Sequence, residues 1–360
     1  MKQPFKPNHL PPNISIEELF KLQPKLLEAT KLLSKTDEML RLSPISTFIV
    51  GYFSMKESVQ STKIEGTQAT FSEVLEANAN KTENNDIREV NNYNEALAFG
   101  TDYIKQYPIT TRLFHQLHSI ILNKSRGSNA DMGSFRKIQN FIGPTNKIQD
   151  ATYIPPEAQH LNDYIKNLEE YINNDEMDTN IPAVLKSAII HAQFEIIHPY
   201  LDGNGRLGRV LIILYLMDKG IISNTSFFIS EELERNKFKY YGLLNNLRKE
   251  NPDWFDWLDF YLSAIISLCK TKIDNLTTTE SIYKKYINFA TDNKINIQVI
   301  DAMFNKLIFS TSDIVNETNL SYSTVRKNIA KMLEAKLLFA NDKRRNKLYY
   351  IYDVIDVFTK

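Results

Sequence analysis

The sequence predicts a mainly α-helical protein that carries a short β-hairpin in its core and a winged helix-turn-helix domain at its C-terminus. Apolar residues recur at spacings of three and four along most of the 360 residues, as expected for helices that bury one face. Residues 135–156 instead show short apolar runs bounded by glycine and proline, which is typical of a hairpin. Residues 311–360 follow the order helix, turn, helix and two-stranded wing.

The N-terminal part is expected to be helical. A stripe of leucines covers residues 16–42, and we expect two helices there, with Pro24 as the break or as a first-turn residue. Another helix is predicted from Ser46 to Glu65, ending at Gly66. The Asn- and Lys-rich segment 78–86 has no large apolar residue and is expected to be an exposed loop.

The middle of the chain combines the predicted hairpin with further helices. Apolar runs end in Gly143-Pro144 and in Pro155-Pro156, where a hairpin would turn or stop. Helical spacing returns at residues 181–197, at residues 207–219 after a glycine loop, and around Trp254, Trp257 and Tyr261. A polar stretch at 271–280 follows. We therefore expect an N-terminal helical region at 1–100, a catalytic core at 101–270 and a winged-helix domain at 280–360.

The C-terminal prediction rests on a helix at 312–318, a turn at Asn319-Leu320 and a helix at 321–336. The wing follows as residues 337–339, a basic turn at 343–347 (Lys-Arg-Arg-Asn-Lys) and a strand at 348–351. Residues 311–360 hold nine Lys+Arg and six Asp+Glu, a net charge of +3, which is a mild signal for DNA binding. The side chains expected to face DNA are Ser321, Tyr322, Ser323 and Arg326. Winged helices also serve as protein-docking or dimer surfaces, so a homodimer is an alternative.

Composition excludes several classes of protein. The 43 basic and 43 acidic residues balance, which gives no global argument for nucleic acid or an anionic membrane. The longest apolar run, Val210 to Met217, is eight residues, whereas a membrane-spanning helix needs about 20. No export signal is apparent, and we expect a cytoplasmic protein. The single cysteine, Cys269, lies in an apolar run and is interpreted as a core residue.

One twelve-residue segment, His198 to Arg209 (HPYLDGNGRLGR), concentrates groups suited to phosphate chemistry. Two glycines around Asn204 let successive N–H groups point into one concavity at a helix start, which binds anions. Arg206 and Arg209 project to one side of the first helical turn and can bind further phosphate oxygens. Asp202 is explained if Mg²⁺ bridges it to the phosphates. His198 has the pKa range of a general base.

This segment resembles the signature of the Fic family, His-Pro-Phe-x-Asp/Glu-Gly-Asn-Gly-Arg-x-x-Arg, with Tyr200 in place of the usual Phe. The ring at that position is expected to pack inward. Most characterised Fic proteins are helical and transfer AMP from ATP to a Ser, Thr or Tyr hydroxyl of a protein. The resemblance therefore implies protein adenylylation, with ATP and Mg²⁺ as required ligands and with possible self-modification.

Residue by residue, the resemblance gives each position in the segment a role. His198 would deprotonate the target hydroxyl, and Asp202 would hold Mg²⁺. Arg206 and Arg209 would bind the β- and γ-phosphates. The α- and β-phosphates would lie on Gly203, Asn204 and Gly205, and the expected ATP-binding set also includes Glu65, Leu207, Gly208 and Tyr240.

Upstream, residues 61–66 (STKIEG) resemble the inhibitory motif of the family, Ser/Thr-x-x-x-Glu-Gly/Asn. Ser61 and Glu65 are four residues apart and share one helix face, and Gly66 is a plausible stop. The resemblance implies that Glu65 pairs with Arg209, which would otherwise hold the γ-phosphate, and so places the chain in the self-inhibited class. Some family members use this glutamate to position water and remove AMP, so Glu65 is also a candidate for that reaction.

Two further segments resemble parts of a Fic site. Residues 141–156 resemble the flap that aligns a target strand, with Thr152 and Tyr153 as its working edge; the alternative is a purely structural hairpin. Tyr240 and Tyr241 resemble the paired tyrosines near the adenine pocket, and as aromatics on an amphipathic helix they are equally consistent with core residues.

Two other functions stay open at the level of sequence. The same loop could move a different group from another phosphate donor, or remove AMP. Alternatively, the chain could be a DNA-binding regulator whose nucleotide site senses ATP without reacting. An intact His198 and Asp202 argue against a pure sensor, because sensing needs no base.

Overall fold

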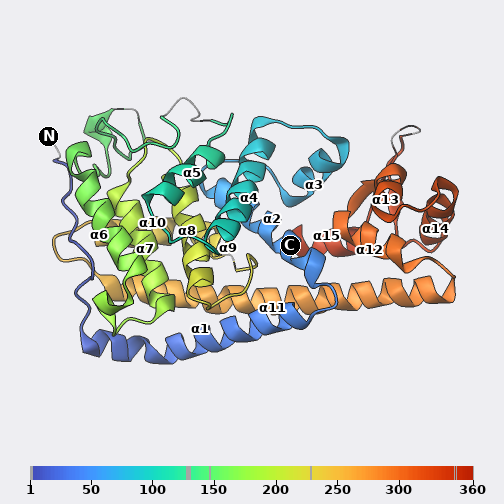
Figure 1. Cartoon of the computed structure of the whole chain (residues 1–360), viewed down its shortest axis with the longest axis horizontal. Coiled ribbons are helices and arrows are strands. Elements are labelled where there is room, and N and C mark those ends of the chain that lie inside the picture. Colours follow the sequence, from blue (N-terminus) through green and yellow to red (C-terminus); the bar gives the residue numbers. More distant parts are fainter. Residues whose placement is uncertain are drawn as a thin grey trace.

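A computed structural model describes residues 3–126, 131–145, 147–227, 229–343, 345 and 347–359 of the chain. Two long helices form its base: α1 (Ile16–Leu42) and α11 (Trp254–Asp292) lie side by side and run in the same direction (Figure 1). Lys25 Nζ lies 2.5 Å from Asp259 Oδ1 near one end of the pair, and the Ser43 hydroxyl donates to Glu280 near the other.

α1 is one continuous helix, so the prediction of two helices at 16–42 is wrong. A capping box between Ser15 and Glu18 starts the helix, and Pro24 lies inside it. Proline removes one backbone hydrogen bond, but buried residues on both sides of it, Leu22 and Ala29, belong to the same packed stripe. Packing of that stripe therefore keeps the helix intact across Pro24.

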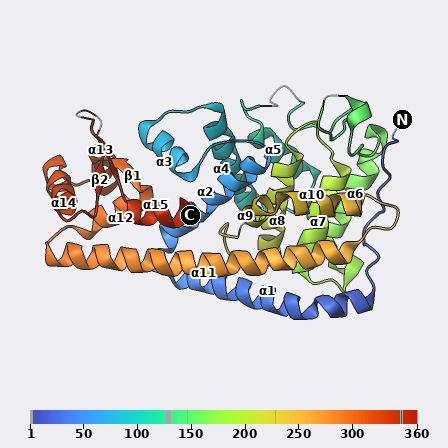
Figure 2. The ribbon, with the colours of Figure 1, turned by 180° about the vertical axis from the view of Figure 1, so that it is seen from behind.

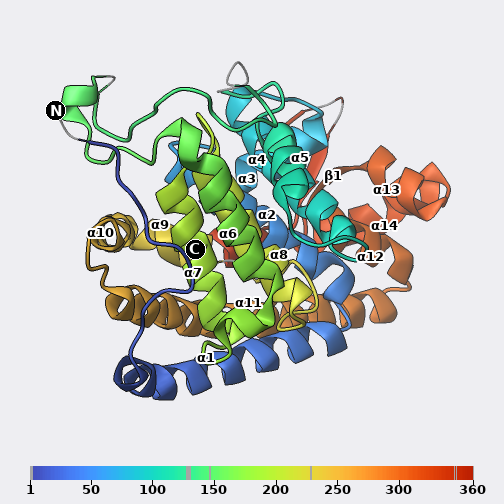
Figure 3. The ribbon, with the colours of Figure 1, turned by 60° about the vertical axis from the view of Figure 1, so that its left-hand side comes forward.

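Most of the remaining helices stand above this base. α7 crosses α11, α6 lies beside α7, and α7 packs along α8 at the centre of the molecule (Figures 1 and 3). α7 is buried along almost its whole length and α8 over most of its length, which fits their apolar residues on all sides. The bounds are α2 (Ser46–Ile64), α3 (Phe71–Asn80), α4 (Asn85–Tyr103), α5 (Thr111–Ile121), α6 (Leu161–Asn173), α7 (Ala183–Ile197), α8 (Asn204–Asp218), α9 (Ser230–Arg235) and α10 (Lys237–Leu247).

Two loops differ from their predictions. The loop expected at 78–86 shortens to 81–84, because α3 continues to Asn80 and Asn84 caps α4. The hairpin expected at 135–156 is reduced, among its described residues, to one antiparallel bridge between Ile142 and Tyr153. Gly143-Pro144 and Pro155-Pro156 flank the paired residues, and proline supplies no N–H to a strand ladder, so pairing does not extend.

Two helices are longer than the sequence predicts. α8 begins at Asn204 rather than at residue 207, which places part of the glycine loop in its first turn. α11 continues through residues 271–280, where the sequence predicts a polar stretch after the core. Leu276 and Thr279 are buried on that stretch, so the polar residues cover the outside of a helix that is packed on its inner face.

The C-terminal part combines helices with a three-stranded antiparallel sheet of order β1-β3-β2. Ile308 pairs with Tyr350 on one side of β3, and Phe339 pairs with Tyr350 on the other. The sequence analysis does not predict β1, and β2 and β3 are shorter than expected. Arg344 and Asn346 of the predicted basic turn lie outside the described residues. The bounds are α12 (Ile297–Lys306), β1 (Ile308–Ser310), α13 (Thr311–Thr318), α14 (Tyr322–Glu334), β2 (Phe339–Ala340), β3 (Leu348–Tyr350) and α15 (Tyr352–Thr359).

The helix α2 joins the C-terminal part to the rest of the molecule. Phe48, near its start, contacts the ring of Phe304 on α12, with ring centroids 5.5 Å apart. Phe358 of α15 packs against Tyr52 and Phe53 of α2, and Figure 2 shows α15 beside α2 and α3. No helix in the described part of the chain is long and apolar enough to span a membrane.

Candidate active site

The loop between α7 and α8 brings the predicted phosphate-binding residues together. His198 ends α7 with a φ of 48°, and Gly203 precedes α8 with a φ of 76°, so two left-handed residues turn the chain back. Glycine takes that conformation without strain, whereas a histidine there is uncommon. The Asn204 side chain accepts from the Tyr200 N–H and donates to the Tyr200 carbonyl, which closes the loop.

Tyr200 is fully buried, as expected for the aromatic position of the signature. Its ring stacks on His118, with centroids 3.8 Å apart and planes 12° apart. The Gly133 N–H donates to Nδ1 of His118, so Nε2 carries the hydrogen and donates to the Asp202 carbonyl. Burial lowers the pKa of His118 to about 4, which keeps this structural imidazole neutral.

Glu65 occupies the anion-binding start of α8. Arg209 donates to Glu65 Oε1 at 2.8 Å, and it also donates to the hydroxyl and carbonyl of Ser61. A Cβ atom on Gly205 would lie 2.2 Å from Glu65 Oε1, so the carboxylate rests directly on the first turn of α8. Free N–H groups at a helix N-terminus attract negative charge, and here a side-chain carboxylate supplies it.

The electrostatics agree with this placement. Burial alone would raise the pKa of Glu65, but the charge and hydrogen bond of Arg209, helped by Arg206, lower it below its usual value. The Arg209 side chain is 1% exposed and that of Glu65 is 33% exposed, so the pair is buried at the arginine and open at the carboxylate. The buried Arg209 needs an anionic partner, and Glu65 supplies one.

Arg206 and Asp202 form a second pair beside the first. Arg206 is buried and lies 3.2 Å from Asp202 Oδ1 and 3.5 Å from Glu89 Oε2. The hydrogen bonds that the described residues give to the Asp202 carboxylate both reach Oδ1, and this side chain is 45% exposed. Oδ2 can therefore act as one oxygen ligand for Mg²⁺. Within the described ranges no group of three or more His, Cys, Asp or Glu could hold a metal alone, so phosphates would have to complete the site.

His198 is held in its neutral form. Burial, together with the positive charges of Arg248 and Arg136, lowers its pKa to about 3. Arg136 donates to the His198 carbonyl at 3.0 Å and to the Pro156 carbonyl, so it fixes the end of α7 against the segment 141–156. The His198 ring Nδ1 lies 3.9 Å from the Glu195 carboxylate, whose pKa burial raises to about 7.

Comparisons with known proteins agree with this geometry. Residues 108–216 match the model of the Fic/DOC family, and residues 23–102 match the model of the Fic/DOC family N-terminal region. Together the two matches cover more than half of the chain. The chain belongs to the Fic/DOC family.

Its curated relatives match over limited stretches. A probable protein adenylyltransferase of Aquifex aeolicus is 35% identical over 94 residues, which are 26% of this chain and 26% of that protein. A protein adenylyltransferase of Caenorhabditis elegans is 26% identical over 105 residues, which are 29% of this chain and 18% of the relative. The chain thus spans about a quarter or less of the length of these two relatives.

Solved structures resemble the chain over larger parts. A Fic family protein from Desulfovibrio desulfuricans G20 covers 97% of this chain and 98% of its own, with a TM-score of 0.58 and 18% identity. Fic-1 from Caenorhabditis elegans covers 72% of this chain and 74% of its own, with a TM-score of 0.55 and 16% identity. At these identities, the similarity shows a shared fold.

The two edge residues of the segment predicted as a Fic flap differ in exposure, because one faces solvent and the other faces the core. Thr152 is exposed, and its N–H donates to the Ile142 carbonyl at 2.7 Å. Tyr153 is buried, donates its hydroxyl to the Ile196 carbonyl at 2.6 Å and lies under the Arg248 guanidinium. The Phe5 N–H donates to the Ile154 carbonyl, so the N-terminal segment already pairs with the next residue of this edge.

The two tyrosines predicted to lie near the adenine pocket, Tyr240 and Tyr241, differ in their exposure. Tyr240 is buried, and its hydroxyl lies 3.0 Å from Nε2 of His191, so it packs in the core behind α8. Tyr241 is 38% exposed and is the one of the two that solvent or a ligand can reach. The sequence pattern is consistent with both a core position and a pocket position for this pair.

Several site residues escaped the sequence analysis. Glu195 lies three residues before His198 and therefore on the same helix face, a spacing that could have identified it. Arg136, Arg248 and Glu89 come from segments far from the signature, and no local pattern marks them. Their roles depend on tertiary packing around the loop.

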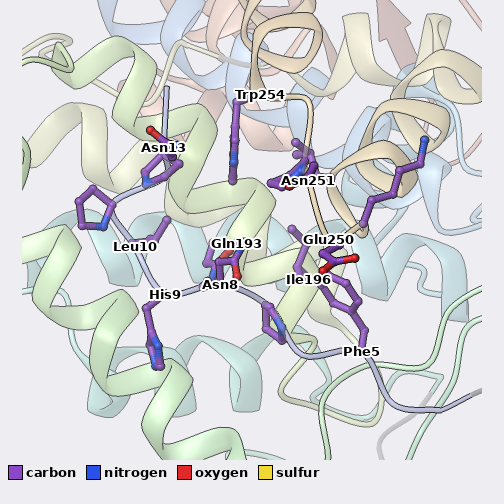
Figure 4. A pocket seen from close by; sticks show the side chains of 16 residues that line it. Phe5, Asn8, His9, Leu10, Asn13, Gln193, Ile196, Glu250, Asn251 and Trp254 are labelled. Atoms are coloured by element: carbon purple, nitrogen blue, oxygen red, sulfur yellow. The ribbon is translucent and has the colours of Figure 1, made fainter. Parts of the chain in front are cut away.

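A hollow of about 360 Å³ lies beside the N-terminal segment, where Asn8, Gln193 and Trp254 are among its lining residues (Figure 4). Gln193 and Ile196 line it together with the N-terminal segment and Trp254. His191 and Glu195 face Gly208 of α8. Gln193 lies two positions from each of them, which in a helix places its side chain on the opposite face of α7. None of the described residues of the signature lines this hollow, which is separate from the candidate active site.

Proposed function

We propose that the chain is a protein adenylyltransferase that transfers AMP from ATP to a Ser, Thr or Tyr hydroxyl. The observation that carries this proposal is the position of Glu65, whose carboxylate lies on Gly205 and Arg209 in the place of an anionic ligand. Two relatives are named protein adenylyltransferases, which favours AMP as the transferred group. An ATP donor also fits the cytoplasmic location expected from the sequence.

In the proposed reaction, the target hydroxyl loses its proton to His198, and its oxygen forms a bond to the α-phosphorus of ATP. The bond from that phosphorus to the bridging oxygen breaks, and pyrophosphate leaves. The His198 imidazole is neutral and can accept a proton, but its lowered pKa makes it a weaker base in this structure than the free histidine that the sequence suggests. Arg206 and Arg209 neutralise the charge that develops on pyrophosphate. Mg²⁺ on Asp202 would supply further neutralisation.

Glu65 inhibits this reaction in the proposed scheme. Its carboxylate competes with the γ-phosphate for Arg209 and for the start of α8, so ATP that enters is misplaced. The substrate then lacks the in-line arrangement that transfer requires. The flap, residues 141–156, would align the target strand through its exposed residue Thr152.

The type of reaction is tested with Glu65→Gly incubated with Mg²⁺ and ATP labelled at either the α- or the γ-phosphate. The acceptors are the chain itself and a cell extract, and products are identified by intact mass and peptide mapping. We expect α-label and a mass gain of AMP, with no label in Glu65→Gly/His198→Ala. Retention of γ-label alone would show phosphate transfer and overturn the proposal. Loss of AMP from a premodified target would instead reveal the reverse activity.

A second function is favoured by the C-terminal part, which we propose to be a winged helix that binds DNA. The exposed residues of α14 include Ser323 and Arg326, on the helix predicted to enter the groove. Fluorescence anisotropy with duplex DNA at rising salt tests this. A salt-dependent affinity that falls in Arg326→Ala is expected; affinity that neither salt nor this substitution changes would contradict it.

A further inference from the structure

The helix that bears Glu65 is fastened along one side by α9 and the start of α10. Each contact joins a residue of α2 to one in the segment 230–237. A buried Glu57 accepts from the N–H and hydroxyl of Ser230, and two ion pairs of 3.1 Å follow. The pairs are Lys56 with Glu231 and Lys63 with Glu234.

Lys237 makes a contact of a different kind. Its Nζ lies 2.5 Å from the carbonyl oxygen of Ile64, the last residue of α2. The last carbonyls of a helix have no partner within the helix, and a cation there also favours the helix dipole. Glu65 is the next residue and the C-cap of α2. A bond that fixes the Ile64 carbonyl therefore fixes the backbone from which the Glu65 side chain extends.

We propose that Lys237 is the positioning residue that holds Glu65 against Arg209, and that it links this inhibitory contact to α10. The inference rests on the proposed function. The Lys237 ammonium also lies 6.0 Å from the ring of Tyr241, the exposed tyrosine of the predicted adenine pocket.

Lys63 offers a matched control. It is also a lysine that ties α2 to α9, but its partner is the Glu234 side chain rather than the backbone beside Glu65. Its side chain is 48% exposed, and exposed ion pairs contribute little. If any lost lysine contact along α2 released the inhibition, the two lysine variants would behave alike.

The experiment measures AMP transfer from labelled ATP for Lys237→Met, Lys237→Arg and Lys63→Met, each with Glu65 intact and with Glu65→Gly. With Glu65 intact, we expect Lys237→Met to raise the rate about fivefold, since a hydrogen bond from a charged donor is lost. Lys237→Arg should keep the inhibited rate, and Lys63→Met should change it less than about twofold. On the Glu65→Gly background at saturating ATP, Lys237→Met should not raise the rate further, because the carboxylate that Lys237 positions is already absent.

The outcomes separate this inference from the proposed function. An unchanged rate in Lys237→Met beside a raised rate in Glu65→Gly overturns the role of Lys237 and leaves inhibition by Glu65 standing. Equal gains in Lys237→Met and Lys63→Met also overturn it. No transfer by any variant, Glu65→Gly included, counts against the proposed activity itself.

Amide hydrogen exchange tests Lys237 without any activity. The N–H groups of Glu65, Gly66 and Thr67 bond back to the carbonyls of Thr62 and Lys63 in the last turn of α2. Lys237→Met should speed exchange of these three amides about fivefold relative to the start of α2, because the turn frays more easily. Unchanged exchange at this turn would contradict the proposal whatever the assay gives.

Discussion

At the scale of single residues, the two buried arginines of the signature, Arg206 and Arg209, are each paired with at least one carboxylate that compensates their charge. Arg209 is almost fully buried, and an uncompensated charge there would cost several kcal/mol, about 3–5. Glu65 meets this need in the structure. In the proposed scheme a phosphate of ATP would replace it, so the same groups would serve both the inhibited state and its reversal.

The protonation state of His198 gives a prediction about pH. A base must be neutral to accept a proton, and burial beside Arg248 and Arg136 lowers the pKa of His198 to about 3. His198 therefore becomes protonated only at a pH far below the usual titration range of histidine. Glu195, beside His198, has a pKa of about 7, so the test uses Glu65→Gly/Glu195→Gln, in which this position cannot titrate. With ATP held as its magnesium complex, kcat/KM of this variant should stay flat from about pH 8 to about pH 5.5. A fall in kcat/KM centred near pH 6.5 would show an unperturbed imidazole and contradict this account.

Single residues also show what sequence can and cannot predict. The spacing of Ser61 and Glu65 predicts a shared helix face, and both do meet Arg209. The signature predicts an inward aromatic ring at Tyr200, which is buried. The contact between Lys237 and Ile64 joins residues 173 positions apart, and no local periodicity encodes such a distance. The same holds for Arg136 and its bond to His198.

At the scale of elements, packing decides where helices end more often than local breakers do. Pro24 and the polar stretch 271–280 both predict interruptions, yet α1 and α11 pass through them, since each buries a stripe against its neighbours. In residues 141–156, the predicted flap, local breakers instead decide where the element ends. There the neighbouring prolines limit pairing to the bridge between Ile142 and Tyr153, because proline supplies no N–H to a strand ladder.

The helix α1 supplies a prediction about Pro24. Pro24 cannot donate to the carbonyl four residues earlier, at the exposed residue Phe20, so Pro24→Ala should restore a helical hydrogen bond. We expect the free energy of unfolding to rise by about 1–2 kcal/mol, measured by urea denaturation. The neighbouring exposed residue Gln23, changed to Ala, is the control and should shift it by less than about 0.5 kcal/mol. A loss of stability in Pro24→Ala would refute the view that packing outweighs a proline defect.

At the scale of the whole molecule, α2 links the C-terminal part to the candidate active site. Its first half packs on α12 and α15 of the C-terminal part, and its second half carries Ser61 and leads to Glu65. One continuous core connects these regions. A change at the C-terminal part can thus reach the contact between Glu65 and Arg209 through a single helix.

Phe358 tests this connection. It is buried on α15, and its ring lies within 5.5 Å, centroid to centroid, of Tyr52, Phe53 and Phe71. Phe358→Ala should lower the free energy of unfolding by about 3–5 kcal/mol, as expected for a cavity in a packed core. Thermal denaturation measures the loss, with the exposed Asp356→Ala as control. Similar small shifts in both variants would mean that α15 is not firmly packed on α2.

The central claim is that the Glu65 carboxylate on Arg209 obstructs AMP transfer, and the rate of that transfer tests it most directly. Wild type, Glu65→Gly and His198→Ala are compared side by side with Mg²⁺ and saturating ATP labelled at the α-phosphate. The account predicts at least about a tenfold higher rate in Glu65→Gly than in wild type, and none in His198→Ala. Equal rates in wild type and Glu65→Gly would contradict it, because the carboxylate on Arg209 would then obstruct nothing.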